Sequence, residues 1–391
     1  MVKTPVLIIG AGPAGLATAG RLHDLGIEYK ILERSDRLAD SWERHYDRLH
    51  LHTIKRFSGL PHYPLPDNLP LYVPRADLVS YYQEYARRFD IQPIFGEEVI
   101  KVEYKGDAWL CQTQAGNSYE ADAVVVCTGF NRIPNVPEFP GQHSFKGSIR
   151  HSRDYKNPEP FAGSRVLVVG MGNSGAEIAL DLVEKGVDTS ISLRGPINIV
   201  PRDLRGRPTQ VTAKMIDKLP NPIADWIGSM VQRLSIGDLS AFGIERPAIS
   251  PRKQLRVLAK TPVLDIGTVA KIRSGQLQVR PGISQLTAKE VCFTDGRQES
   301  YDHLVLATGY HTAVSDFIEN SESLLNEHGH PKGPIAEDSH SDLYFVGFDA
   351  YSSGLLESIY RDSRRVVAHM IQKKDKFNWY VHPEKERQVS D

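Results

Sequence analysis

The chain has 391 residues, of which 40% are hydrophobic and 24% are charged, a composition typical of globular proteins with about two domains. Its 47 lysine and arginine residues nearly balance 48 aspartate and glutamate residues, which argues against a nucleic-acid partner and favours small molecules. No apolar run is long enough to cross a bilayer, and no secretory signal precedes the first predicted strand, so we expect a cytoplasmic protein without a membrane span.

The first predicted unit, residues 5–34, reads as strand, glycine-rich loop, helix and strand. Glycines at this spacing let the backbone approach a pyrophosphate at the N-terminus of a helix. Glu33 ends the second strand, where a carboxylate accepts hydrogen bonds from both ribose hydroxyls and repels a 2′-phosphate. The unit therefore predicts a dinucleotide site without a 2′-phosphate. The candidate contacts in its loop are Gly10, Gly12, Pro13, Ala14 and Gly15.

Two later segments end alike. Residues 115–130 (AGNSYEADAVVVCTGF) and residues 295–310 (DGRQESYDHLVLATGY) each predict a turn, a strand of a small antiparallel meander and a buried parallel strand. The first runs into Thr128 and Gly129, and the second into Thr308 and Gly309. Between the first unit and these segments, residues 42–75 are rich in His, Tyr and Pro and predict an irregular loop over a site.

Residues 165–194 repeat the first unit, with Gly170, Gly172 and Gly175 in the loop. Arg194 stands where the first unit has Glu33, and its guanidinium suits a 2′-phosphate, so this unit should prefer NADPH over NADH. The alternatives are that Arg194 is a solvated turn residue, or that the nearby Arg202 or Arg205 shares its task.

Together these units predict an α/β fold with two Rossmann-like dinucleotide-binding domains, the second inserted into the first. We expect an FAD-binding domain at 1–158 and 311–391 and an NADPH-binding domain at 159–310, with a helical insertion at about 209–250. The insertion carries an apolar helical pattern, which favours packing against its own domain. A substrate cap, a subunit contact in a homodimer and, least of all, membrane contact are the alternatives. The apolar positions are Met215, Ile216, Leu219, Ile223, Trp226, Ile227, Met230, Val231 and Leu234.

A permanently held FAD and an exchanging NADPH imply hydride transfer to a flavin. The three cysteines, Cys111, Cys127 and Cys292, form no C-x-x-C pair, which argues against a disulfide reductase and leaves O2 as the acceptor for the reduced flavin. The histidine clusters, such as His328 with His330, lack carboxylates or thiols at metal-ligand spacing, so no metal is expected.

The segment before the second unit, FKGSIRHSRDY at 145–155, resembles the motif of class B flavin-containing monooxygenases. Phe145, Gly147, His151 and Tyr155 occupy the fixed positions, and Baeyer–Villiger monooxygenases end the similar motif with Trp. A second stretch, KTPVLDIGTVAKIRSGQLQVRPGI at 260–283, is similar to plant YUCCA-type indole-3-pyruvate monooxygenases.

Carried over by position, the resemblance implies further cofactor contacts and one catalytic candidate. Animal members carry Asn near the flavin where this chain has His52, which is either a catalytic residue or an ordinary packed histidine. A helix from about Leu355 would aim its N-terminus at the flavin. Asp349, Ala350 and Tyr351 depart from the plant pattern, so the resemblance does not carry substrate recognition over at these three positions. The implied FAD contacts are Glu33, Arg34, Ser41, Trp42, Thr128 and Gly129, and the implied NADPH contacts are Gly172, Asn173, Ser174 and Arg194.

The activity that the resemblance implies is NADPH-dependent monooxygenation through a C4a-(hydro)peroxyflavin, with one atom of O2 inserted into a small organic substrate. An aryl 2-oxo acid such as indole-3-pyruvate, decarboxylated oxidatively to indole-3-acetate, is the first hypothesis for the substrate. N- or S-oxygenation of amines or sulfides is the second hypothesis. A regulatory protein that binds FAD and NADPH with slow turnover is the third.

Overall fold

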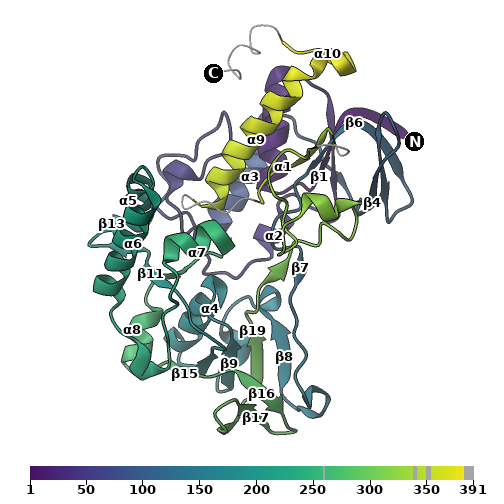
Figure 1. Ribbon diagram of the computed structural model, residues 1–391. Coiled ribbons are helices and arrows are strands. Elements are labelled where there is room, and N and C mark those ends of the chain that lie inside the picture. Colours follow the sequence, from purple (N-terminus) through teal and green to yellow (C-terminus); the bar gives the residue numbers. More distant parts are fainter. Residues whose placement is uncertain (259, 338–340, 349–353, 383–391) are drawn as a thin grey trace. The chain divides into compact units, whose positions relative to one another are not determined.

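The structure is a computed structural model that describes residues 1–258, 260–337, 341–348 and 354–382 (Figure 1). Asp349, Ala350 and Tyr351, singled out above, lie outside the described residues. The chain divides into two compact units. The first comprises Met1–Arg44, Thr53–Ile133 and Tyr310–Asp391, and the second comprises His45–His52 and Pro134–Gly309.

The first unit is built on a seven-stranded sheet in the order β3-β2-β1-β6-β5-β4, with β21 also pairing with β6. β1 pairs in parallel with β2 and β6, and its Val6, Leu7 and Ile8 are fully buried, as expected of a strand covered on both faces. The strands are β1 (Val2–Ile9), β2 (Tyr29–Glu33), β3 (Ile94–Phe95), β4 (Val99–Tyr104), β5 (Trp109–Thr113), β6 (Ser118–Val126) and β21 (Leu343–Phe345).

Helix α1 packs beside the C-terminal helix α9, and Figure 1 shows the two side by side in purple and yellow. Arg21 of α1 fastens the pair, because its Nε donates to Ser363 Oγ at 3.1 Å and its Nη2 donates to the Tyr360 carbonyl at 3.1 Å. The helices of this unit are α1 (Pro13–Leu25), α2 (Asp40–Glu43), α3 (Arg75–Arg88), α9 (Leu355–Gln372) and α10 (Lys374–Phe377).

One detail of the predicted meander is wrong. Residues 118–126 form a single strand, β6, instead of a meander strand followed by a separate buried strand. Its first half pairs antiparallel with β5, and its second half pairs in parallel with β21, while β1 runs along the other edge. One unbroken strand can make both pairings because β6 keeps its direction while its neighbour on that edge changes from β5 to β21.

The second unit is built on a five-stranded parallel sheet in the order β15-β10-β9-β19-β8. Here the end of the meander and the buried strand are separate, as the sequence predicts. The strands of the main sheet are β8 (Ser148–His151), β9 (Arg165–Val169), β10 (Asp188–Ser192), β15 (Gln278–Arg280) and β19 (His303–Leu306). The antiparallel meander comprises β16 (Ile283–Leu286), β17 (Glu290–Phe293) and β18 (Gln298–Ser300).

The second unit also contains five helices and two pairs of short strands among the described residues. The helices are α4 (Asn173–Glu184), α5 (Thr209–Ile216), α6 (Asn221–Ile236), α7 (Pro251–Leu258) and α8 (Thr268–Arg273). Two strand pairs are β11 (Ile199–Pro201) with β14 (Val263–Asp265) and β12 (Asp203–Leu204) with β13 (Arg207–Pro208). Short strands β7 (Ile133–Pro134) and β20 (Tyr310–His311) lie where the chain passes from one unit to the other.

The compact units divide the chain earlier than the expected boundary after residue 158. The division lies between Ile133 and Pro134, because β8 joins the second sheet by pairing with β19. The short segment 45–52, expected in the first domain, also belongs to the second unit, where Tyr46, Arg48 and His52 contact α4.

The apolar pattern of the insertion does not pack as predicted. Trp226 is 63% exposed and Leu234 is 81% exposed, while α6 buries Ala224, Gln232 and Ile236 on its opposite face. Gln232 can face inward because its amide donates hydrogen bonds to Asn198 Oδ1 and the Ile199 carbonyl, both at 3.0 Å. The resulting stripe on α5 and α6, here called the α5–α6 stripe, consists of Met215, Leu219, Ile223, Trp226, Met230 and Leu234.

Candidate functional site

The first glycine loop connects β1 to α1 and has no room for side chains at two of its three glycines. Gly10 has φ +106°, and a Cβ there would lie 2.8 Å from the Cys127 carbonyl oxygen. A Cβ on Gly15 would lie 2.0 Å from the Gly10 carbonyl oxygen. Gly12 is the N-cap of α1 and faces open space, with no side-chain cap from the described residues. The first turn of α1 therefore offers free backbone N–H groups at a position that a phosphate can approach closely.

Two polar groups next to this loop fit an adenine dinucleotide. Glu33 is half-buried at the end of β2, and its Oε2 accepts a hydrogen bond from the Ala11 backbone N–H at 2.8 Å. Thr128 follows β6, and its buried Oγ1 has no hydrogen-bond partner among the described residues. Because a buried hydroxyl without a partner is costly, this atom marks a place that a bound polar ligand would complete.

The remaining candidates of the first unit lie on short elements. Ser41 and Trp42 belong to α2, and the Trp42 ring meets the buried Tyr82 edge-on at 6.1 Å between centroids. Arg34 is exposed, with Nη1 4.0 Å from a carboxylate oxygen of Glu98. Leu355 begins α9, so the helix N-terminus predicted there is present.

The second glycine loop repeats the backbone geometry of the first. Gly170 has φ +99°, and a Cβ there would lie 2.6 Å from the Ala307 carbonyl oxygen. A Cβ on Gly175 would lie 2.0 Å from the Gly170 carbonyl oxygen, while Gly172, the N-cap of α4, faces open space. This loop therefore presents the same kind of phosphate cradle.

The side chains around the second loop are arranged differently from those around the first. Arg194 lies just after β10, is exposed and makes no polar side-chain contact with the described part of the chain. Its guanidinium is therefore available to an anionic ligand. Asn173 already makes a hydrogen bond within the chain, because its Oδ1 accepts the Leu264 backbone N–H at 2.7 Å. Thr308 is also satisfied, because its Oγ1 donates to the Asn135 carbonyl at 2.5 Å.

The linker motif stabilises the second unit. Gly147 is required because a Cβ there would lie 2.6 Å from the ring of Phe145 and 2.8 Å from the Asp302 carbonyl oxygen. His151 Nδ1 accepts the Arg153 backbone N–H, so its Nε2 carries the proton that is shared with the Gly309 carbonyl at 3.1 Å. Burial lowers the pKa of His151 and keeps its imidazole neutral.

Tyr155, the last residue of the motif, is buried and donates its hydroxyl proton to Asp181 Oδ2 at 2.7 Å. Burial and this carboxylate both raise the pKa of Tyr155, so the phenol remains protonated. Asp181 lies on α4, the helix that begins at the second glycine loop. His151 and Tyr155 therefore fasten the motif to Gly309, which follows β19, and to helix α4.

His52 lies on the short segment 45–52, on the wall of a cavity of about 360 Å³ within the second unit. Its Nε2 is 3.4 Å from Glu177 Oε2, and the same oxygen accepts the hydroxyl proton of Tyr46 at 2.8 Å. Arg48 lies on the same wall, where it contacts Asp181 at 3.3 Å and Glu184 at 2.8 Å. The cavity is lined by Arg48, His50, His52, Glu177, Asp181, Glu184, Arg202 and Ile266.

The sequence analysis missed four residues of this arrangement: Tyr46, Arg48, Glu177 and Asp181. Glu177 and Asp181 stand four residues apart in an otherwise apolar helix and are only 3% and 7% exposed. Carboxylates at this spacing on one face of a buried helix are a recognisable signal of bound partners. The alternation of polar side chains at 46, 48, 50 and 52 is a second signal.

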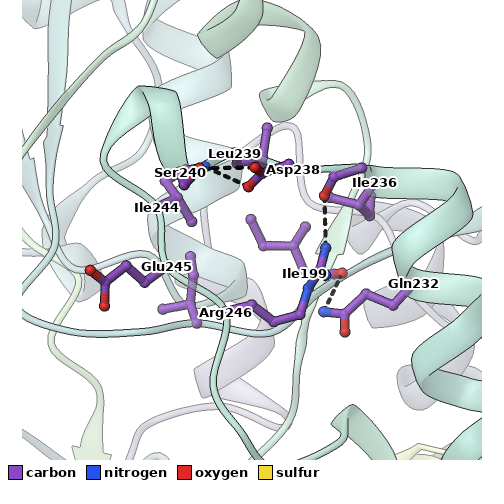
Figure 2. Close-up of a pocket in the computed structure, with 11 residues that line it drawn as sticks. Ile199, Gln232, Ile236, Asp238, Leu239, Ser240, Ile244, Glu245 and Arg246 are labelled. Atoms are coloured by element: carbon purple, nitrogen blue, oxygen red, sulfur yellow. Dashed lines mark hydrogen bonds between the residues drawn. The ribbon is translucent and has the colours of Figure 1, made fainter.

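A second cavity of the same unit, of about 290 Å³, lies between the end of α6 and β11 (Figure 2). Its floor is apolar, with Ile199, Ile236 and Ile244 buried. Two of the polar groups on its wall that Figure 2 shows are bonded within the chain, because Asp238 accepts from Ser240 and Gln232 donates to the Ile199 carbonyl.

Two further features of the described residues concern metal binding and membrane insertion. No group of three or more histidine, cysteine, aspartate or glutamate side chains in that part of the chain is arranged to hold a metal ion. Among the helices that the structure describes, none combines the length and the apolar character needed to span a bilayer.

Comparison with known proteins identifies the family of the chain. Residues 3–328 match the model of the family described as flavin-binding monooxygenase-like. The chain is 40% identical to the probable indole-3-pyruvate monooxygenase YUCCA9 of Arabidopsis thaliana, over 89% of this chain and 84% of the relative. It is 37% identical to the indole-3-pyruvate monooxygenase YUCCA4 of Oryza sativa subsp. japonica, over 94% of this chain and 87% of the relative.

Among solved structures, an oxidized steroid monooxygenase bound to NADP superposes with a TM-score of 0.75. The match covers 99% of this chain and 89% of that chain at 18% sequence identity, so it establishes the fold alone. The predicted α/β fold with two Rossmann-like units is therefore confirmed.

Proposed function

The chain belongs to the flavin-binding monooxygenase-like family, and from this membership we propose that it is an FAD- and NADPH-dependent monooxygenase of an aryl 2-oxo acid such as indole-3-pyruvate. The reaction takes one 2-oxo acid, one O2, one NADPH and one proton. It gives the carboxylate shortened by one carbon, CO2, NADP+ and water. Indole-3-pyruvate would thus become indole-3-acetate.

The observation that carries this proposal is the identity of 37 to 40% to indole-3-pyruvate monooxygenases over about nine-tenths of the chain. The fit of both glycine loops to dinucleotides supports the same proposal from the geometry.

In this proposal the first unit holds FAD. The N-terminus of α1 takes the pyrophosphate, Glu33 accepts the ribose hydroxyls, and the orphaned Thr128 hydroxyl gains a partner from the ligand. When bound, the flavin supplies the redox chemistry, namely hydride uptake and activation of O2. The N-terminus of α9, which begins at Leu355, contributes a positive backbone dipole.

The second unit would hold NADPH. The N-terminus of α4 takes the pyrophosphate, with contacts from Gly172, Asn173 and Ser174, and the exposed Arg194 pairs with the 2′-phosphate. Thr308 and Gly309, which follow β19, are further candidate cofactor contacts, and both also bond within the unit, Thr308 to the Asn135 carbonyl and Gly309 to His151.

The test is product analysis with the purified, FAD-loaded protein, NADPH and isotopically labelled O2. The proposal expects indole-3-acetate with one labelled carboxylate oxygen and one NADPH consumed per acetate. A larger yield of N-oxide or S-oxide from amines or sulfides than of acetate would favour the alternative substrate class. NADPH oxidation that no substrate accelerates would favour a binding protein with slow turnover.

The proposal places the enzyme in the cytoplasm, as a homodimer. Cys111, Cys127 and Cys292 are buried free thiols, which fits a reducing compartment. The exposed α5–α6 stripe is the surface on which a second copy would pack. Sedimentation analysis should detect a dimer, and the double variant Trp226→Gln/Leu234→Gln should shift it to monomer while the FAD content stays unchanged.

A further inference from the structure

Four side chains of the second unit form a line from the glycine loop to His52. Ser174, the second residue of α4, lies near the Tyr46 hydroxyl and acts to lower the pKa of that phenol. Tyr46 donates its own proton to Glu177 Oε2 at 2.8 Å, and this same oxygen lies 3.4 Å from His52 Nε2. Tyr46 and Glu177, in the middle of this line, are only 2% and 3% exposed.

Glu177 decides which nitrogen of His52 carries the proton. A carboxylate can only accept, so this contact favours an N–H at Nε2, and in a neutral ring that tautomer leaves Nδ1 as a bare acceptor. Nδ1 is buried and has no hydrogen-bond partner in the part of the chain that the structure describes. Glu177 is therefore the polar group that orients the ring among the residues that the structure describes.

The other charged groups on the cavity wall are already engaged. Arg48 pairs with Asp181 and Glu184, and Asp181 also accepts the proton of Tyr155. Arg202 pairs with Asp203 at 3.0 Å, and His50 Nδ1 contacts the Arg48 carbonyl at 2.6 Å. Glu177 is thus the anion that acts on His52.

We propose that Glu177 is a positioning residue that sets the proton of His52 on Nε2 and, through Tyr46 and Ser174, couples this setting to nucleotide bound at the second glycine loop. The inference rests on the proposed function, because it assigns the α4 loop to NADP(H). Burial and Glu177 both raise the pKa of Tyr46, so the phenol stays protonated and keeps the link intact. Carboxylates that orient histidines in this way are common where a histidine serves a bound group.

The first test is spectroscopic and uses FAD-loaded protein with isotope-labelled histidine. Nitrogen NMR distinguishes the two tautomers, and we expect the Nε2–H form of His52 in the wild type. Adding NADP+ should shift the His52 signals. In Glu177→Gln the amide can donate as well as accept, so a population of the Nδ1–H form should appear. In Tyr46→Phe the NADP+-induced shift should shrink, because the hydroxyl link is lost.

The second test is the equilibrium dissociation constant of NADP+ for the same FAD-loaded protein. Glu177→Gln and Tyr46→Phe should weaken binding about three- to tenfold, the value of one net hydrogen bond. Glu184→Gln is the matched control, because Glu184 lies on the same helix face and pairs with Arg48 instead. It should leave the dissociation constant within about twofold.

A pair of substitutions at His52 separates tautomer setting from packing. Gln places its amide N–H where Nε2 stands, whereas Asn is too short to reach Glu177. His52→Gln should therefore keep the NADP+ affinity within about threefold, and His52→Asn should lose as much as Glu177→Gln. Unfolding curves of all variants check that each is folded.

Two outcomes would overturn the proposal: a wild-type His52 in the Nδ1–H form, or NADP+ affinity unchanged in both Glu177→Gln and Tyr46→Phe. Equal NADP+ affinity of His52→Gln and His52→Asn would overturn the claim that Glu177 sets the tautomer of His52. If the wild-type protein binds FAD but not NADP+, the assignment of the α4 loop to NADPH fails first. That result is distinguishable, because it is seen before any variant is made.

Discussion

The two glycine loops share one backbone device but differ in how the following threonines are satisfied. Both loops exclude side chains at their first and third glycines, and both leave the N-terminus of a helix open. Thr308 donates to the Asn135 carbonyl, whereas the buried Thr128 Oγ1 has no partner among the described residues. The Thr128 hydroxyl thus gains a partner only from a ligand, whereas the Thr308 hydroxyl is satisfied by the protein itself. This difference suits a cofactor that stays and a cofactor that exchanges.

The residues at the strand ends, Glu33 and Arg194, differ in burial and in their polar contacts. Glu33 is half-buried and tied to the Ala11 backbone N–H, so it forms part of the loop. Arg194 is exposed and makes no polar contact with other described side chains, so its charge faces solvent until an anion arrives. Glu33 is thus held in place by the protein before a ligand binds, whereas the Arg194 guanidinium gains a polar partner only when an anion binds.

The largest expected effect tests the shared backbone device. Gly15→Ala and Gly175→Ala each place a Cβ 2.0 Å from a backbone oxygen, so each should lower the free energy of unfolding by about 3 kcal/mol or more. Gly12→Ala is the matched control, because its Cβ meets nothing within 4 Å. It should fold normally but retain less FAD, measured by flavin absorbance, since the methyl group occupies the phosphate approach. Equal stability of Gly12→Ala and Gly15→Ala would contradict the packing argument.

The next effect concerns the charge at the second strand end. Arg194→Ala should weaken NADPH binding about 10- to 100-fold, the loss of a charge-assisted contact, and leave NADH binding unchanged. Fluorescence titration with both nucleotides measures this. Arg205→Ala, also an exposed arginine of this unit, should change either affinity less than about twofold. A larger loss in Arg205→Ala than in Arg194→Ala would move the 2′-phosphate contact to Arg205.

The third effect tests the difference between the threonines directly. Thr308→Val removes a hydrogen bond that the chain makes itself and should lower the free energy of unfolding by about 1 kcal/mol in the FAD-free protein. Thr128→Val removes none, so the FAD-free protein should lose less than about 0.5 kcal/mol, while its affinity for FAD decreases. Chemical denaturation with and without FAD gives both quantities. Equal destabilisation by the two substitutions would show that Thr128 has a protein partner.

The smallest effect is a pH dependence from the linker motif. Burial lowers the pKa of His151, so the folded protein binds a proton there less readily than the unfolded chain, whose histidines titrate near pH 6.5. The free energy of unfolding should therefore be unaffected above that pH and fall as the pH drops below it. Burial also lowers the pKa of His303, His330 and His369, so His151→Asn should flatten this decline only in part. An unchanged slope in His151→Asn would show that His151 does not contribute.

The sequence was most informative where one strand or loop needs a particular local conformation. Both predicted βαβ units are confirmed, because parallel buried strands and glycine turns leave patterns that neighbouring residues do not obscure. The family was also readable from short motifs, and it is confirmed by the relatives. The individual cofactor contacts and the role of His52 remain predictions.

By itself, the sequence determined the fold class, the two nucleotide loops and the family, since each depends on local backbone geometry and residue type. The tertiary structure decided what depends on distant neighbours: that β6 is one strand, that Glu177 faces His52, and that α6 turns Gln232 inward and Trp226 outward. An amphipathic pattern separates the apolar face of a helix from its polar face. Which face is buried also depends on polar partners elsewhere in the fold, such as Asn198 for Gln232.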